Sequence, residues 1–81
     1  MSAVLTLAAV RERQQAQAHE EYLRSRIAWH RDRAKQALKL ARIAARHGNA
    51  GLAAGLLDEA CTYRAMALGL EQQRASQEVR S

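Results

Sequence analysis

The sequence is poor in the residues that interrupt or cross-link a chain. Its 81 residues include no proline, four glycines and one cysteine. Without proline, little in the chain forces a helix to end. A single cysteine, Cys61, allows no internal disulfide and is compatible with a reducing cytoplasm. Hydrophobic residues make up 48% of the chain, which is too many for a disordered protein. We therefore expect one all-α domain.

Signals for export or membrane insertion are also missing. The apolar start, residues 1–10, has no preceding positive residue and is followed by no cleavage-like boundary. It is also far too short to span a bilayer, which takes about 20 apolar residues. We therefore expect a soluble, cytoplasmic protein that does not enter a membrane.

Motifs for catalysis or metal binding are absent from the sequence. There is no glycine-rich phosphate loop and no nucleophile elbow, and the adjacent carboxylates point apart on a helix. His19, His30 and His47 lack the spacing of three or four residues that a helical metal site needs, and Cys61 has no companion ligand. We expect no enzyme activity, no metal and no cofactor.

The strongest break in the helix-forming pattern is His47-Gly48-Asn49. Glycine and asparagine enter the left-handed conformation at low cost, so helices commonly end on them. Asn49 is also a suitable N-cap for a second helix, accepting from the amide of residue 51 or 52. A short link makes consecutive helices antiparallel neighbours. The sequence predicts a helical hairpin in which residues 23–46 pack against residues 50–73.

A seam of apolar and small side chains supports this hairpin. It alternates steps of four and three residues along the first helix and consists of Leu23, Ile27, His30, Ala34, Ala37, Ala41 and Ala44. Small residues on such a seam let two helices approach closely. We expect His30 to be a hydrogen-bonded core residue; the alternative is a pH-sensitive contact. We also expect Cys61, on the apolar arc of the second helix, to be a small core residue.

More apolar surface is present than one hairpin can cover. A second row on the first helix, a third of a turn from the seam, consists of Tyr22, Trp29, Leu40 and Ile43. The apolar start adds Val4, Leu5, Leu7 and Val10, in a segment (residues 1–14) that projects beyond the second helix. This surplus predicts a partner or dimer interface, and favours a homodimer that forms a four-helix bundle. The alternative is that the many alanines make the apolar arcs look wider than the surface that must be buried, because alanine tolerates exposure.

The pattern leaves alternatives for the ends of the hairpin. One continuous helix from about residue 3 to residue 46 is possible, and so is a short first helix that bends in the polar stretch 11–21. The polar C-terminal residues 74–81 are expected to fray.

Positive charge is concentrated on the first helix. Residues 11–46 carry ten Lys/Arg and four Asp/Glu, whereas residues 48–81 carry three and four. A basic stripe within about 80° of the helix surface consists of Arg24, Arg31, Lys35, Lys39, Arg42 and Arg46. Such a stripe suits an acidic protein partner or phosphates, but is also compatible with a solvated helix face.

These features favour a small protein–protein interaction module that binds and modulates, and most simply inhibits, a target protein with an acidic surface. The alternative is a nucleic-acid-binding protein without sequence specificity. The second helix has no Lys or Arg before Arg64, so we do not expect it to read bases in a groove.

Overall fold

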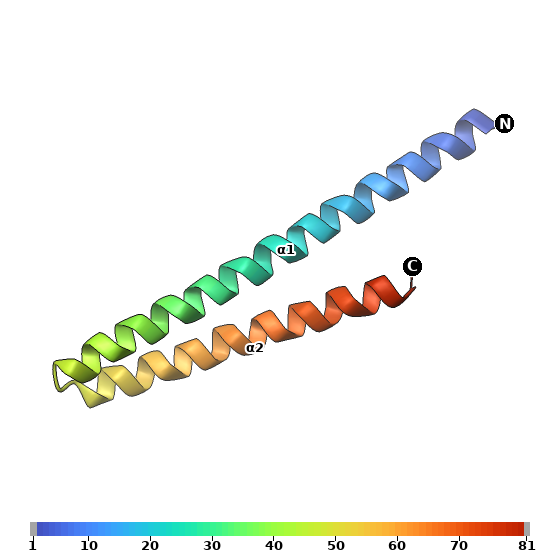
Figure 1. The fold of residues 1–81 in the computed structure, drawn as a ribbon. Coiled ribbons are helices and arrows are strands. Elements are labelled where there is room, and N and C mark those ends of the chain that lie inside the picture. Colours follow the sequence, from blue (N-terminus) through green and yellow to red (C-terminus); the bar gives the residue numbers. More distant parts are fainter. Residues whose placement is uncertain (1, 81) are drawn as a thin grey trace.

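The protein is an extended antiparallel helical hairpin. The structure, a computed structural model, describes residues 2–80 and the side chains of residues 6–77. These residues form α1 (Ser2–Arg46) and α2 (Ala50–Arg80), which lie side by side and measure 71 × 17 × 11 Å overall (Figure 1). The predicted all-α hairpin is confirmed.

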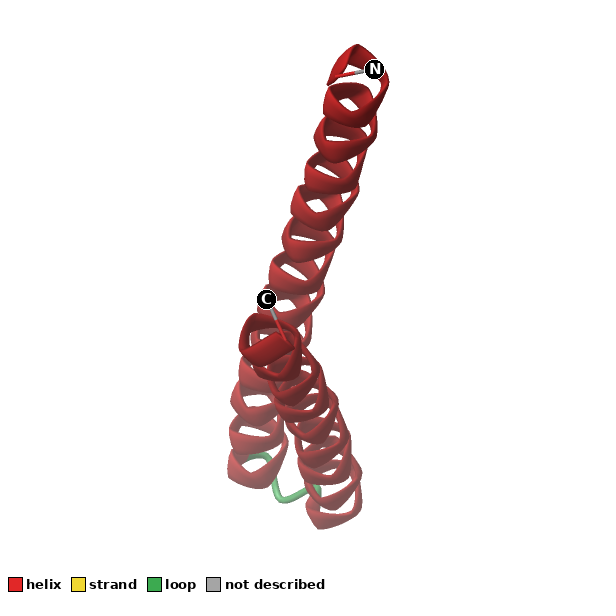
Figure 2. Ribbon diagram, turned by 90° about the vertical axis from the view of Figure 1, so that its right-hand side faces the viewer, coloured by secondary structure: helices red, strands yellow, loops and turns green. Residues whose placement is uncertain are grey.

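The turn is closed as the sequence predicts. Gly48 has φ of +75°, the left-handed conformation in which a side chain would be strained. The Asn49 amide donates to the Ala44 carbonyl at 2.9 Å, and the Gly48 amide donates to the Ala45 carbonyl at 3.0 Å, which is a Schellman C-cap. Asn49 Oδ1 then accepts from the Leu52 amide at 3.1 Å and caps α2. The green loop in Figure 2 is therefore short and well hydrogen-bonded.

The predicted seam of α1 is the core of the hairpin. All seven of its residues are buried, and they are Leu23, Ile27, His30, Ala34, Ala37, Ala41 and Ala44. His30 is only 5% exposed, and its Nδ1 lies 2.7 Å from the Arg26 carbonyl oxygen. A carbonyl only accepts, so Nδ1 carries the proton and donates. The expected hydrogen-bonded core histidine is confirmed.

Helix α2 contributes a narrower core than its composition suggests. Its buried residues recur every seventh position, at Ala53, Ala60 and Ala67. Cys61, which the sequence predicts to be a core residue, is exposed, so that prediction is wrong. Cys61 follows the buried Ala60 and therefore points about 100° away from the seam. The alanine-rich composition of α2 made its apolar arc look wider than the part that α1 covers.

Helix α1 is continuous through the polar stretch and extends well past the end of α2 (Figures 1 and 2). The far end of the paired region holds polar contacts between the helices: Arg74 Nε lies 2.6 Å from Glu20 Oε1, and Gln77 Nε2 lies 2.8 Å from His19 Nε2. Pairing therefore reaches beyond the expected residues 23–73. Helix α2 runs to Arg80, so residues 74–80 of the segment for which fraying is expected are helical, and Ser81 lies outside the described residues.

Neither helix has, within the described residues, a stretch that is long and apolar enough to cross a bilayer.

Candidate interaction surfaces

The hairpin carries a row of large apolar side chains on each helix, and together these form a surface that we call the aromatic face. Its members are Tyr22, Trp29, Leu40 and Ile43 on α1 and Leu52, Leu56, Tyr63 and Met66 on α2. Leu40, Leu56 and Tyr63 line one hollow, and Tyr22 and Met66 line another. Ile43 lies three residues after Leu40, and Leu52 lies four residues before Leu56, which places each on the same side of its helix as that neighbour.

Trp29 lies at the centre of the aromatic face. Its ring meets Tyr63 of α2 edge to face, with 5.7 Å between centroids. The guanidinium carbons of Arg26 and Arg33 lie 5.1 and 5.2 Å from the Trp29 ring centroid, and that of Arg33 lies 5.9 Å from Tyr63. Trp29 nevertheless leaves 43% of its surface exposed. Tryptophan, tyrosine and arginine are the residues that most often dominate binding energy at protein interfaces.

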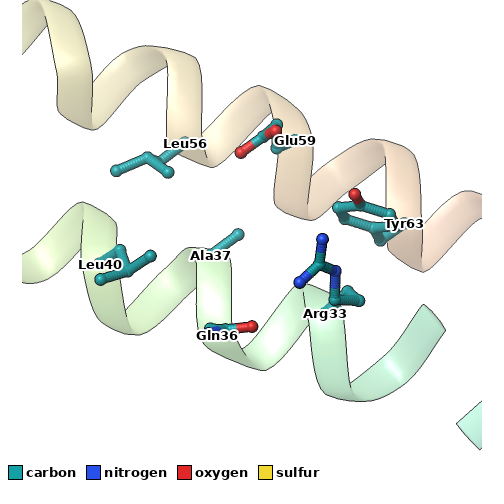
Figure 3. Close-up of a pocket in the computed structure, with 7 residues that line it drawn as sticks. All are labelled: Arg33, Gln36, Ala37, Leu40, Leu56, Glu59 and Tyr63. Atoms are coloured by element: carbon teal, nitrogen blue, oxygen red, sulfur yellow. The ribbon is translucent and has the colours of Figure 1, made fainter. Parts of the chain in front are cut away.

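Two hollows flank the Trp29–Tyr63 contact along the helices. One, of about 170 Å³, is lined by Arg33, Gln36, Ala37, Leu40, Leu56, Glu59 and Tyr63. Figure 3 shows Arg33 rising from α1 toward Tyr63 of α2, with Leu40 and Leu56 at the other end. The second, of about 320 Å³, is lined by Tyr22, Arg26, His30, Met66, Gly69 and Leu70. Both are shallow surface hollows, and the first is smaller than the roughly 300–1,000 Å³ typical of small-molecule sites. This relief suits protruding side chains of another protein.

The basic stripe lies on the other side of the hairpin. All six of its residues are exposed. Arg24 pairs with Glu20 at 3.2 Å on its own helix, and Arg31 pairs with Glu71 of α2. The other four, Lys35, Lys39, Arg42 and Arg46, form no ion pair within the described residues. Their charge is therefore available to a partner.

A groove beside the stripe joins it to α2. This groove, of about 240 Å³, is lined by Arg31, Ala34, Lys35, Leu38 and Arg64. Arg64 was not part of the predicted stripe, because only the packing of the two helices brings it beside Lys35. We call this side of the hairpin, with the stripe and the groove, the basic face.

The described side chains of the apolar N-terminal segment, residues 6–10, are exposed, in the part of α1 that extends past the end of α2 (Figure 1). Leu7 is 62% exposed and Val10 is also exposed. Val4 and Leu5 belong to helix α1, but their side chains lie outside the described part of the chain.

Four members of the aromatic face were missed in the sequence as interface residues: Leu52, Leu56, Tyr63 and Met66. Their signal was their apolar character at spacings of four, seven and three residues. That pattern does not say which side of α2 shares a face with Trp29.

Within the described residues, no group of three or more His, Cys, Asp or Glu side chains is placed to hold a metal ion. Comparison with protein-family models, curated proteins and solved structures gave no match.

Proposed function

We propose that this protein is a small, non-enzymatic interaction module that binds a target protein and modulates, most simply inhibits, its activity. In this proposal it acts as a homodimer, a four-helix bundle in which two aromatic faces pack against each other. The observation that carries the proposal is the Trp29–Tyr63 pair, built from both helices and flanked by Arg26 and Arg33, in which Trp29 is exposed and Tyr63 is partly buried. The proposed location is the cytoplasm, where an exposed thiol such as Cys61 stays reduced.

The size of the aromatic face supports self-association. From Tyr22 to Ile43 it runs for about 32 Å at about 1.5 Å per residue, and it is two helices, or about 20 Å, wide. That footprint of about 600 Å² is close to the roughly 800 Å² that each partner buries in a stable protein–protein interface. Protruding side chains make the contact area larger than this flat footprint.

The small size of the hairpin core also supports self-association. Seven buried residues are alanines, and Leu23 is the one large side chain that is fully buried within the described residues. A small domain with little buried apolar surface is marginally stable unless it oligomerises. Packing two aromatic faces together would bury the large side chains that the hairpin leaves exposed.

The test of self-association is the solution mass, measured by light scattering over a concentration series. The expected mass is twice the 9.0 kDa of one chain. Leu40→Glu, which places a charge in the aromatic face, is expected to give the mass of one chain. Leu38→Glu is the matched control, because Leu38 lies about 160° away around the same helix and is similarly exposed, at 38% against 45% for Leu40. A wild-type monomer, or equal effects of the two substitutions, contradicts the proposed dimer.

The test of target binding is site-specific photo-cross-linking in the cells that produce the protein. A photoreactive residue replacing Tyr22 is expected to give a self-adduct, whereas one replacing Lys35, about 140° around α1 from Tyr22 and on the basic face, is expected to cross-link a different protein. Absence of any adduct to another protein from the basic face, the aromatic face and the Leu7 region would argue against a target-binding module.

A second candidate function is nucleic-acid binding without sequence specificity. It is favoured by the four cationic side chains of the stripe that have no ion pair in the described region. Binding of this kind weakens with salt, by about 0.9 decade per decade of salt for each phosphate neutralised. A mobility shift with duplex DNA or RNA at low salt would support it, and its absence would exclude it.

A further inference from the structure

We propose that the basic face binds an acidic amphipathic helix of the target protein, which lies along the groove between α1 and α2. This inference rests on the proposed function, because it identifies the surface that is left for a target once two aromatic faces have packed together.

The groove itself has an apolar floor and a cationic rim. Ala34, which is buried, and Leu38, which is partly exposed, form the floor, while Arg31, Lys35 and Arg64 surround it. Its volume of about 240 Å³ lies below the range of about 300–1,000 Å³ for small-molecule sites. The groove is suited to one anchoring apolar side chain and not to a whole ligand.

The charge around the groove is net positive, with Asp32 three residues from Lys35 on α1. Glu71, the carboxylate beside it on α2, is already paired with Arg31. Lys35, Arg42 and Arg64 form no ion pair among the residues that the structure describes. A partner that lies here must therefore bring negative charge, which would also steer its approach.

The α2 side of the same face is apolar. Leu57, Cys61 and Leu68 are exposed, and they lie next to Arg64 at spacings of seven, three and four residues. The basic face is thus cationic along α1 and, apart from Arg64, apolar along α2. An amphipathic helix with an acidic edge and an apolar edge matches both halves, in the mode of a helix that docks into a groove.

A nucleic acid matches the face less well. Phosphates would meet the cations of α1 but would leave the leucines of α2 exposed. The face also has no exposed aromatic residue on which bases could stack, within the residues described.

The length of the cationic part matches a helical partner. From Arg31 to Arg46 it runs for about 22 Å, the length of a helix of about 15 residues.

The experiment measures binding of a synthetic peptide to the full chain by fluorescence anisotropy. The probe is a labelled helical peptide of 18 residues with Leu at alternating spacings of three and four and Glu on the remaining surface. Its control carries Gln in place of Glu. We expect the Glu peptide to bind at least tenfold more tightly than the Gln peptide, with an affinity that falls as salt rises. Equal affinities, or no binding of the Glu peptide, overturn the inference.

Variants of the chain locate the binding site. Lys35→Glu and Leu38→Glu are expected to weaken binding of the Glu peptide at least tenfold. Arg13→Glu changes the net charge as much as Lys35→Glu does, but outside the part of α1 that α2 faces, and is expected to leave binding nearly unchanged. Equal losses with Lys35→Glu and Arg13→Glu would overturn the inference, because they would show that net charge alone attracts the peptide. Tighter binding of an 18-base-pair DNA duplex than of the Glu peptide would overturn it in favour of a nucleic-acid surface.

Leu40→Glu separates this inference from the proposed dimer. It is expected to change the mass of the protein while leaving peptide affinity intact, because Leu40 lies on the aromatic face. A wild-type protein that is monomeric but still binds the peptide through Lys35 would refute the dimer and support the basic face. A wild-type protein that is dimeric but does not bind the peptide would support the dimer and overturn the inference about the basic face.

Discussion

Trp29 of α1 and Tyr63 of α2 meet edge to face, with 5.7 Å between ring centroids and 80° between ring planes, at the surface of the hairpin. Such aromatic contacts contribute about 0.5–1.5 kcal/mol beyond the area they bury. This pair therefore adds to the seam in holding the rotation of the two helices against each other. It also presents a large aromatic surface to the outside, with Arg26 and Arg33 held against it.

Removing aromatic side chains from this face is expected to weaken association. The double variant Trp29→Ala, Tyr22→Ala removes two such side chains. Loss of one interface hot spot alone costs about 2 kcal/mol or more of binding free energy, so the dissociation constant of the dimer should rise about 30-fold or more. Sedimentation equilibrium measures that constant, and circular dichroism should show nearly unchanged helicity. The matched control is Leu57→Ala, Leu68→Ala on the basic face, which should leave the mass unchanged. An unchanged dissociation constant in the aromatic variant would contradict the role of this face.

Enlarging a seam residue is expected to destabilise the hairpin. Ala41 is 3% exposed between closely approaching helices, so Ala41→Leu forces them apart and should lower the free energy of unfolding by about 1–3 kcal/mol. Ala45→Leu, at an exposed position four residues further along, should change it by less than about 0.5 kcal/mol. Urea denaturation followed by circular dichroism compares the two. Equal effects would mean that the seam is not tightly packed.

The same substitution at two glycines is expected to have opposite effects. Gly48→Ala places a side chain at φ of +75° and should destabilise the protein by about 1–2 kcal/mol. Gly55 lies inside α2, and a Cβ added there meets nothing within 4 Å, so Gly55→Ala should stabilise it by about 0.5–1 kcal/mol. Thermal unfolding at one protein concentration measures both. A stabilising Gly48→Ala would show that the turn differs from the Schellman cap described above.

Breaking the ion pairs of Glu20 is expected to have a small, salt-dependent effect. Glu20 pairs with Arg74 at 2.6 Å and with Arg24 at 3.2 Å, but these side chains are partly exposed. Glu20→Gln should therefore lower the free energy of unfolding by no more than about 1 kcal/mol. Salt screens such pairs, because the Debye length falls from above about 10 Å at 0.05 M salt to about 3 Å at 1 M salt. The difference in stability between Glu20→Gln and the wild type should therefore shrink over this range. Glu21→Gln, at an exposed neighbour without a described ion pair, is the control and should show no such loss.

The turn and the seam were predictable because they depend on local chemistry. Gly48 and Asn49 end one helix and begin the next through hydrogen bonds that span five residues or fewer. The seam from Leu23 to Ala44 repeats with the period of a helix, and all of its predicted members are buried. A chain with one turn has only one other helix, so the helix that packs against this seam was known in advance.

The composition of the two faces was not predictable in the same way. Trp29 and Lys35 were assigned to different rows of α1 from their spacing. Nothing in the sequence indicated that Tyr63 would complete the first row and Arg64 the second. Cys61 was misplaced for the same reason, because alanine, leucine and cysteine on α2 are compatible with several rotations of that helix.

The sequence by itself determined two helices, the place of the turn and the residues of α1 that face α2, because each follows from backbone hydrogen bonding or from the helical period within one segment. Only the tertiary structure decided which side of α2 shares a surface with Trp29 and which with Lys35. That choice depends on how side chains of two helices interlock, and a helical period carries no information about the rotation of one helix relative to another.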